Sequence, residues 1–101
     1  MTAELPEVLP GVANALLILC DTHGGADLSV RIVEYTAMGR PMISIGSMSW
    51  DRDRVMQAAT DGWIEIQKDE RAGVVCRPTE AGYDWLGHYR ARQLKKGRAT
   101  L

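Results

Sequence analysis

The side chains that most often carry chemistry are few in this chain of 101 residues, and they lie far apart in the sequence. The two cysteines, Cys20 and Cys76, lie far apart, as do His23 and His88, so the chain has no CxxC or HxxxH pattern of the kind that holds zinc. No nucleophile stands in a recognisable motif with a histidine, and no pair of catalytic carboxylates stands out. We therefore expect no metal, no cofactor and no enzymatic activity, and we interpret both cysteines as buried free thiols.

The charged residues indicate a different chemistry, the binding of an anionic partner. The net charge is −1, but the first half of the chain is net acidic and the second half is net basic. From residue 90 onward the charged residues are all basic, namely Arg90, Arg92, Lys95, Lys96 and Arg98. This asymmetry indicates an anionic partner for the C-terminal half, or a flexible basic tail at residues 93–101 that is merely solvated.

Length and composition describe one ordinary domain, spanning residues 1–101. Apolar residues make up 46% and charged residues 25% of the chain, as in soluble globular proteins. A domain this small buries a limited fraction of its surface, which favours dimerisation.

The longest apolar run, Ala15 to Cys20, is too short to cross a bilayer, and the N-terminus has acidic residues where a signal peptide is basic. We expect a cytoplasmic protein without a membrane partner.

Four helices are expected from apolar periodicity and helix-end signals. The first runs from Leu9 to Cys20, and the second follows Asp27 and ends near Gly39. The third is capped by Ser47 or Ser49 and ends near Thr60, with Val55, Met56 and Ala59 facing inward. The fourth is capped by Thr79 and carries the apolar residues Ala81, Trp85, Leu86 and Tyr89.

Strands are expected in two places. Residues 63–67, "WIEIQ", alternate strictly between apolar and polar side chains, and "VVCR" at 74–77 returns after the charged turn "KDERAG". The segment 42–46, "MISIG", is either a short strand or an extended loop. The expected fold class is therefore mainly α with a small antiparallel β-hairpin, in the order α-α-(β)-α-β-β-α.

The segment 61–86, "DGWIEIQKDERAGVVCRPTEAGYDWL", resembles the second half of a winged helix-turn-helix domain of the MarR/PadR kind. In those domains the recognition helix ends in a glycine, and an apolar strand, a charged wing, a second strand and a "TEAG" helix start follow. The resemblance implies a transcription regulator that binds duplex DNA as a homodimer. Its helix 49–60 would enter the major groove, and its wing 67–74 would contact the adjacent backbone or minor groove.

The resemblance also assigns roles to residues of this sequence. On the recognition helix, Arg54 would bind a guanine and Gln57 an adenine, while Ser49 and Arg52 suit phosphates. On the wing the expected DNA contacts are Lys68, Arg71 and Arg77. Helices 1 and 4 would form the dimer interface, through Leu9, Val12, Leu16, Trp85 and Tyr89.

The sequence departs from that pattern in ways that keep other functions open. The connection 39–49 is longer than the tight turn of the family, and Asp51, Asp53, Asp69 and Glu70 dilute the basic surface. One alternative is a winged-helix protein-interaction module, such as an adapter or inhibitor from a mobile element, that does not bind specific DNA. A weaker alternative is a regulator with a small-molecule pocket between the first helix and the winged helix.

Overall fold

The computed structural model describes residues 5–71 and 73–99, with residues 96–99 described only as part of a helix. The elements are α1 (Ala13–His23), a short 3-10 helix η1 (Gly25–Asp27), β1 (Val30–Arg31), β2 (Val33–Ala37), β3 (Arg40–Ile45), β4 (Met48–Asp51), α2 (Arg52–Thr60), β5 (Ile64–Asp69), β6 (Gly73–Pro78) and α3 (Glu80–Ala99). The described chain is thus a small α+β fold with three α-helices and two three-stranded antiparallel sheets. The expectation of a mainly α fold with one small hairpin is wrong.

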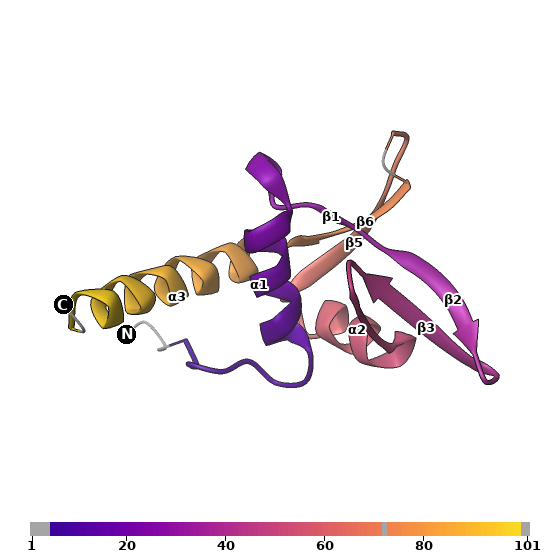
Figure 1. Ribbon diagram of the computed structural model, residues 1–101, viewed down its shortest axis with the longest axis horizontal. Helices are drawn as coiled ribbons and strands as arrows, with labels where there is room; N and C mark the ends of the chain where they lie inside the picture. Colours follow the sequence, from indigo (N-terminus) through magenta and orange to yellow (C-terminus); the bar gives the residue numbers. More distant parts are fainter. Residues whose placement is uncertain (1–4, 72, 100–101) are drawn as a thin grey trace.

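The two sheets share one extended segment of chain. The first sheet has the strand order β1-β6-β5 and the second β2-β3-β4. Only Ile32 separates β1 from β2, and its N–H donates to the carbonyl oxygen of Val74 at 2.9 Å. In Figure 1 the β2–β3 and β5–β6 hairpins project from one end of the molecule, whereas the far end of α3 lies at the opposite end. The molecule is correspondingly elongated, with extents of 46 × 27 × 25 Å.

The helix expected between Asp27 and Gly39 is wrong, because this segment forms β1 and β2. Val30 and Ile32 are buried while Arg31 between them is exposed, which is the period of a strand and not of a helix. Half of residues 30–37 are β-branched, and such residues favour strands. Met38 and Gly39, with φ of 53° and 78°, then form a two-residue turn into β3. The strand considered for residues 42–46 is real and belongs to β3.

The core lies between the helices and the inner faces of the two sheets. α1 contacts β1, β5, β6 and α3, while α2 contacts β3, β4 and β5. The expected first helix is confirmed, although it begins at Ala13. Its apolar face joins one continuous buried cluster with both sheets, and the largest fully buried side chains of that cluster include Leu16, Leu17, Ile43, Ile64, Trp85 and Leu86.

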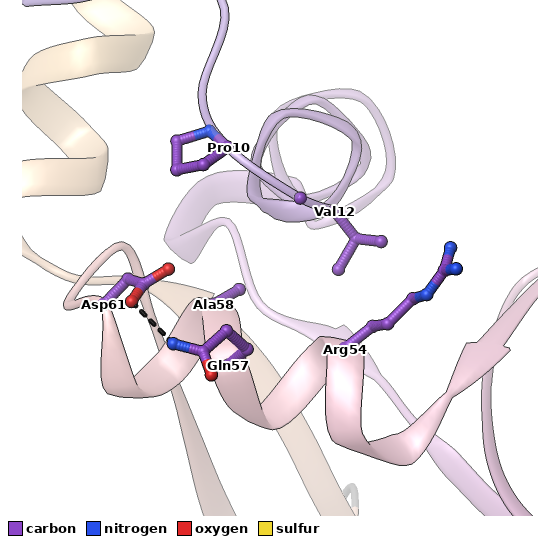
Figure 2. A pocket seen from close by; sticks show the side chains of 7 residues that line it. Pro10, Val12, Arg54, Gln57, Ala58 and Asp61 are labelled. Atoms are coloured by element: carbon purple, nitrogen blue, oxygen red, sulfur yellow. Dashed lines mark hydrogen bonds between the residues drawn. The ribbon is translucent and has the colours of Figure 1, made fainter.

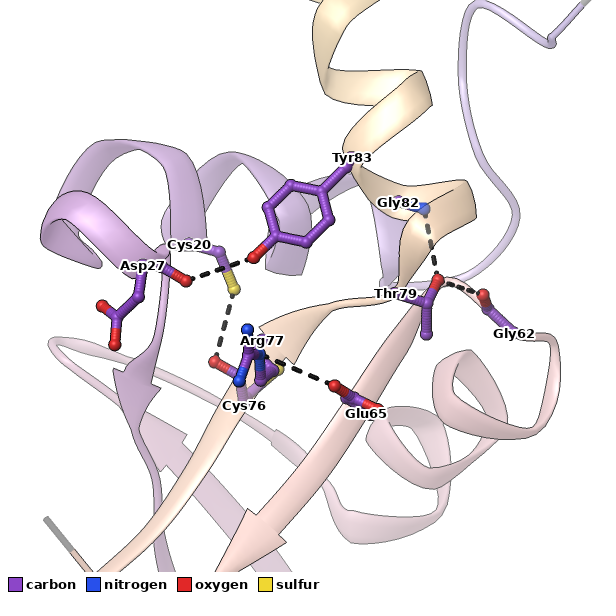
Figure 3. Close-up of polar contacts among 9 residues, drawn as sticks. All are labelled: Cys20, Asp27, Gly62, Glu65, Cys76, Arg77, Thr79, Gly82 and Tyr83. Carbon is purple, nitrogen blue, oxygen red and sulfur yellow. Dashed lines mark hydrogen bonds and ion pairs between the residues drawn. The ribbon is translucent and has the colours of Figure 1, made fainter. Parts of the chain in front are cut away.

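The two cysteines meet inside this core. Both are fully buried free thiols, as expected from the sequence, and the Sγ of Cys20 lies 3.6 Å from the carbonyl oxygen of Cys76. Figure 3 shows this contact between α1 and β6. Hydrogen bonding with the Cys20 side chain, followed by burial, raises the pKa of the Cys76 thiol well above its ordinary value. Both thiols are part of the packing of the core.

The "TEAG" segment fixes the start of α3 against the end of α2. The Oγ1 of Thr79 accepts the N–H of Gly82 at 3.2 Å, which makes Thr79 an N-cap, and it donates to the carbonyl oxygen of Gly62 at 2.5 Å. Gly82 is buried, and a Cβ at this position would lie 2.3 Å from the carbonyl oxygen of Trp63. The glycine is needed because the helix approaches the chain before β5 so closely (Figure 3).

The far half of α3 projects beyond the core, beside the N-terminal segment (Figure 1). The indole N–H of Trp85 donates to the carbonyl oxygen of Pro6 at 2.8 Å, and a guanidinium nitrogen of Arg92 lies 3.7 Å from a carboxylate oxygen of Glu7. The helix continues to Ala99, through most of the segment expected to be a tail. Residues 100–101 of that segment lie outside the described residues.

Candidate nucleic-acid interface

The β5–β6 hairpin, which the sequence predicts as a wing, is confirmed as a structural element. Its register pairs Lys68 with Val74 and Asp69 with Gly73. An Oδ1 of Asp69 accepts the backbone N–H of Arg71 at 2.8 Å, so this acid organises the turn. Lys68 and Arg71 are both exposed. The hairpin therefore presents two cations around a turn held in shape by a carboxylate.

Arg31 adds a third cation to this hairpin, and the sequence analysis missed it. β1 pairs with β6 so that Arg31 lies opposite Val75. Its Nε lies 3.9 Å from the place that a Cβ would take at Gly73, and its side chain is exposed. Arg31 and Lys68 leave opposite faces of the sheet, because their partners on β6 are consecutive residues. The signal was the alternation of Val30, Arg31 and Ile32, which a helical reading of this segment hides.

Helix α2 begins later than the predicted recognition helix. Ser49 lies in β4 opposite Ser44, so it does not cap the helix. Asp51 occupies the N-cap position, and its side chain makes no cap hydrogen bond. Val55 and Ala58 are the buried residues of α2, whereas Arg52, Arg54 and Gln57 are exposed, as expected for a surface helix.

The predicted DNA contacts on α2 do not all share one face, because Arg52 lies apart from Arg54 and Gln57. The Nε of Arg52 lies 3.7 Å from a carboxylate oxygen of Glu34 on β2. Arg54 and Gln57 instead line an open pocket of about 290 Å³ beside the residues that precede α1, lined in full by Pro10, Gly11, Val12, Arg54, Gln57, Ala58 and Asp61. Figure 2 shows Arg54 extending beside Val12. The Nε2 of Gln57 donates to Oδ1 of Asp61 at 2.8 Å, so this amide already has a partner in the residue that follows α2.

Arg77, the third DNA contact predicted on the wing, instead contacts other residues of its own chain. It is half-buried near the end of β6, and its Nε lies 3.6 Å from a carboxylate oxygen of Glu65. The side-chain oxygen of Tyr83, and more weakly the Glu65 carboxylate, raise the pKa of Arg77 above its ordinary value. The hydroxyl of Tyr83 in turn donates to the carbonyl oxygen of Asp27 at 3.3 Å (Figure 3). The structure thus places Arg77 in a contact between β6, β5 and α3, away from the turn of the hairpin.

The remaining cations divide between the two ends of the molecule. On α3, Arg90 pairs with Asp21 and Arg92 with Glu7. Within the part of the chain that the structure describes, the exposed cations that form no salt bridge on the hairpin end are Arg31, Arg40, Arg54, Lys68 and Arg71. On the described part of α3, Lys95 is an exposed cation that forms no salt bridge. Unpaired positive charge is therefore gathered mainly on β1, the two hairpins and the start of α2.

The residues predicted for a dimer interface lie in the interior of the single chain. Leu9, Val12, Leu16 and Trp85 have exposed fractions between 0% and 8%. Tyr89 is half-buried and its ring stacks on Trp85, with 5.3 Å between the centroids. Because these side chains complete the core of one copy, they leave little surface for a second copy in this conformation.

Comparison with known proteins finds no match for the chain. No protein-family model matches it, and neither a curated protein nor a solved structure is significantly similar to it. Among residues 5–71 and 73–99, no helix is both long and apolar enough for a membrane span. Over the same residues, no three side chains from histidine, cysteine, aspartate and glutamate are grouped as metal ligands would be.

Proposed function

We propose that the protein binds duplex DNA with the end that carries the two hairpins and the start of α2. The observation that carries this proposal is that five exposed cations on β1, the two hairpins and the start of α2 have no salt-bridge partner among the described residues. Phosphate contacts by such side chains supply most of the affinity of DNA-binding proteins. Hairpins and helices are also the elements that fit the grooves of a duplex.

The acids on this end oppose binding less than their number implies. The Glu34 carboxylate is balanced by Arg52, and Asp69 orders the turn that carries Arg71. Asp51 and Asp53 lie at the start of α2, where the helix dipole favours negative charge. Lys68, Arg71 and Arg31 would contact phosphates from both sides of the β5–β6 hairpin. Gln57 would read a base only by exchanging its bond with Asp61.

We further propose that this DNA binding regulates transcription. A cytoplasmic location and a homodimer are part of the same proposal, and no catalytic role is included. The dimer would need a surface other than the buried side chains Leu9, Val12, Leu16 and Trp85. Sedimentation measurements with and without a duplex give the number of copies in the complex.

The direct test is a salt series of fluorescence-anisotropy titrations with a labelled duplex. Each cation that neutralises a phosphate contributes about 0.9 to the slope of log affinity against log salt concentration. We expect Arg31→Gln, Lys68→Gln and Arg71→Gln each to weaken binding and to lower the slope by about one contact. Lys95→Gln is the matched control, because Lys95 lies on α3 and is also exposed. The proposal fails if the wild type does not bind at low salt, or if Lys95→Gln weakens binding as much as the hairpin variants.

A protein-interaction module is the second candidate, and exposed apolar side chains favour it. Val33 is 53% and Tyr35 39% exposed on strand β2, at the edge of its sheet. This candidate predicts that charge reversal at Arg54 and Arg71 leaves function intact, while Val33→Lys and Tyr35→Lys abolish it. A wild type that fails to bind any duplex would favour this candidate.

A further inference from the structure

The turn between β2 and β3 contains a residue type that such turns rarely have. Met38 has a φ of 53° in the two-residue turn that joins Ala37 to Arg40. Such turns favour asparagine, aspartate or glycine, because other residues are strained at positive φ. A methionine at this position costs stability that an asparagine would restore. Backbone strain of this kind is often retained at functional sites.

The strain at Met38 has no compensation within the described chain. Leu28 is the other described non-glycine residue with positive φ, at 55°, but it is partly buried and packs against the core. Met38 is fully exposed, at 101%. Its thioether therefore contacts nothing that would stabilise it, although it is a long apolar side chain.

The tip that carries Met38 projects outward and has one cation and no acidic residue. Where β4 pairs with β3, the last residue pair is Asp51 with Met42. The β2–β3 pairs Thr36–Pro41 and Ala37–Arg40 therefore extend beyond β4 as a two-stranded ribbon. Arg40 follows the turn and is exposed, without a salt bridge among the described residues. Residues 36–41 contain no acidic side chain. The ribbon thus ends in an apolar tip next to a cation, away from the far end of α3 and pointing in a different direction from the β5–β6 hairpin (Figure 1).

We propose that the β2–β3 ribbon is a second DNA-contacting arm, in which Met38 wedges between base steps in the minor groove and Arg40 contacts the adjacent phosphate. This inference rests on the proposed function. Apolar side chains inserted at a base step unstack it and bend the duplex, and the energy is recovered through additional protein contacts. We favour a nucleic acid over a protein as the partner, because its phosphates would neutralise the five cations that have no salt-bridge partner. Steps such as TA and CA/TG are the easiest to unstack, so we expect them at the wedge.

The decisive variant is Met38→Asn, which relieves the strain and removes the apolar tip at the same time. Melting temperature, affinity and duplex bending are measured together, the last by energy transfer between dyes on the two ends of a duplex that contains TA and CA/TG steps. We expect Met38→Asn to raise the melting temperature, to abolish bending and to weaken binding without changing the salt slope. Arg40→Gln is expected to lower the salt slope by about one contact.

The matched control is Met48→Asn. Met48 is also an exposed methionine, at 44%, but it lies at the other end of the same sheet, at the start of β4. Its replacement is expected to leave bending unchanged. The wedge is overturned if Met38→Asn bends the duplex as the wild type does, or if the wild type binds without bending. A wild type that binds no duplex overturns the proposed function together with the wedge.

Discussion

The hydroxyl oxygen of Thr79 lies 2.5 Å from the carbonyl oxygen of Gly62, and the same oxygen accepts the N–H of Gly82. One side chain thereby joins the residues after α2 to the first turn of α3. The hairpin β5–β6 is held between these two points. Its orientation relative to α2 therefore depends on Thr79.

Thr79→Ala removes both hydrogen bonds, and we expect it to lower the free energy of unfolding by about 1–3 kcal/mol. Thr79→Ser keeps the hydroxyl and should lose much less. Chemical denaturation of both variants measures the difference. Equal stability of Thr79→Ala and the wild type would contradict this role.

Two glycines of α3 should respond in opposite directions to alanine. At Gly82 a Cβ would lie 2.3 Å from the carbonyl oxygen of Trp63 and 2.9 Å from Cδ2 of Leu17, so Gly82→Ala should destabilise the fold by about 1–3 kcal/mol or more. At Gly87 a Cβ would meet nothing within 4 Å, and Gly87→Ala should stabilise the helix by about 0.5–1 kcal/mol. Thermal melting of the two variants tests the close approach, which a neutral Gly82→Ala would disprove.

The buried Cys76 predicts a loss of stability at alkaline pH. An unfolded cysteine ionises near pH 8.5, whereas the pKa of Cys76 in the folded chain is higher. Above about pH 8.5 Cys76 thus loses its proton in the unfolded chain and keeps it in the folded chain, and its contribution lowers the free energy of unfolding by up to about 1.4 kcal/mol per pH unit. The stabilising contribution of Cys76 is fully present below pH 8.5. The pKa of Cys20 is lowered by its contact with Cys76 and contributes with the opposite sign.

Denaturation at several alkaline pH values measures this slope in the wild type and in Cys76→Val, which has a similar volume and no titrating group. The variant should lose stability less steeply above pH 8.5. Identical slopes would show that Cys76 ionises alike in the folded and unfolded chains. In native protein neither cysteine should react with a thiol reagent, because both are fully buried.

Asp69 provides a test that separates charge from loop order in DNA binding. If the acid only repels phosphate, Asp69→Asn and Asp69→Ala should both tighten binding. Because its Oδ1 accepts the N–H of Arg71, we expect Asp69→Asn, which keeps an acceptor, to bind more tightly than the wild type. Asp69→Ala should gain less or bind more weakly. Anisotropy titrations at one salt concentration distinguish these outcomes, and tighter binding by Asp69→Ala than by Asp69→Asn would refute the ordering role.

The sequence predicts the elements whose signals are local. The alternation in "WIEIQ", the charged turn and the capping Thr79 correctly indicate β5, β6 and the start of α3. The end of α2 near Thr60 and the buried thiols also agree with the structure. In each case a few neighbouring residues determine the backbone conformation, because capping and alternation act over short distances.

The second sheet could not be predicted in the same way. Asp27 is a plausible helix cap, and the turn at residues 38–39 lacks the asparagine or aspartate that normally indicates a hairpin. The place of Arg31 depends on the pairing of β1 with β6, a contact between residues far apart in the sequence. For the same reason the ion pair between Glu34 and Arg52, and the contact of Arg77 with Glu65, could not be anticipated.

The single extended segment at residues 30–37 also has a consequence for the order of folding. β2, β3 and β4 pair with their neighbours in the chain, whereas β1 pairs with β6, which is made much later. Local hairpins close faster than long loops, so the second sheet should form before the first. During synthesis on the ribosome, β1 therefore has no partner strand, and the apolar face of α1 stays exposed, until residue 76 has emerged. We expect the chain to be prone to aggregation during this interval, because apolar surface and an unpaired strand are then exposed.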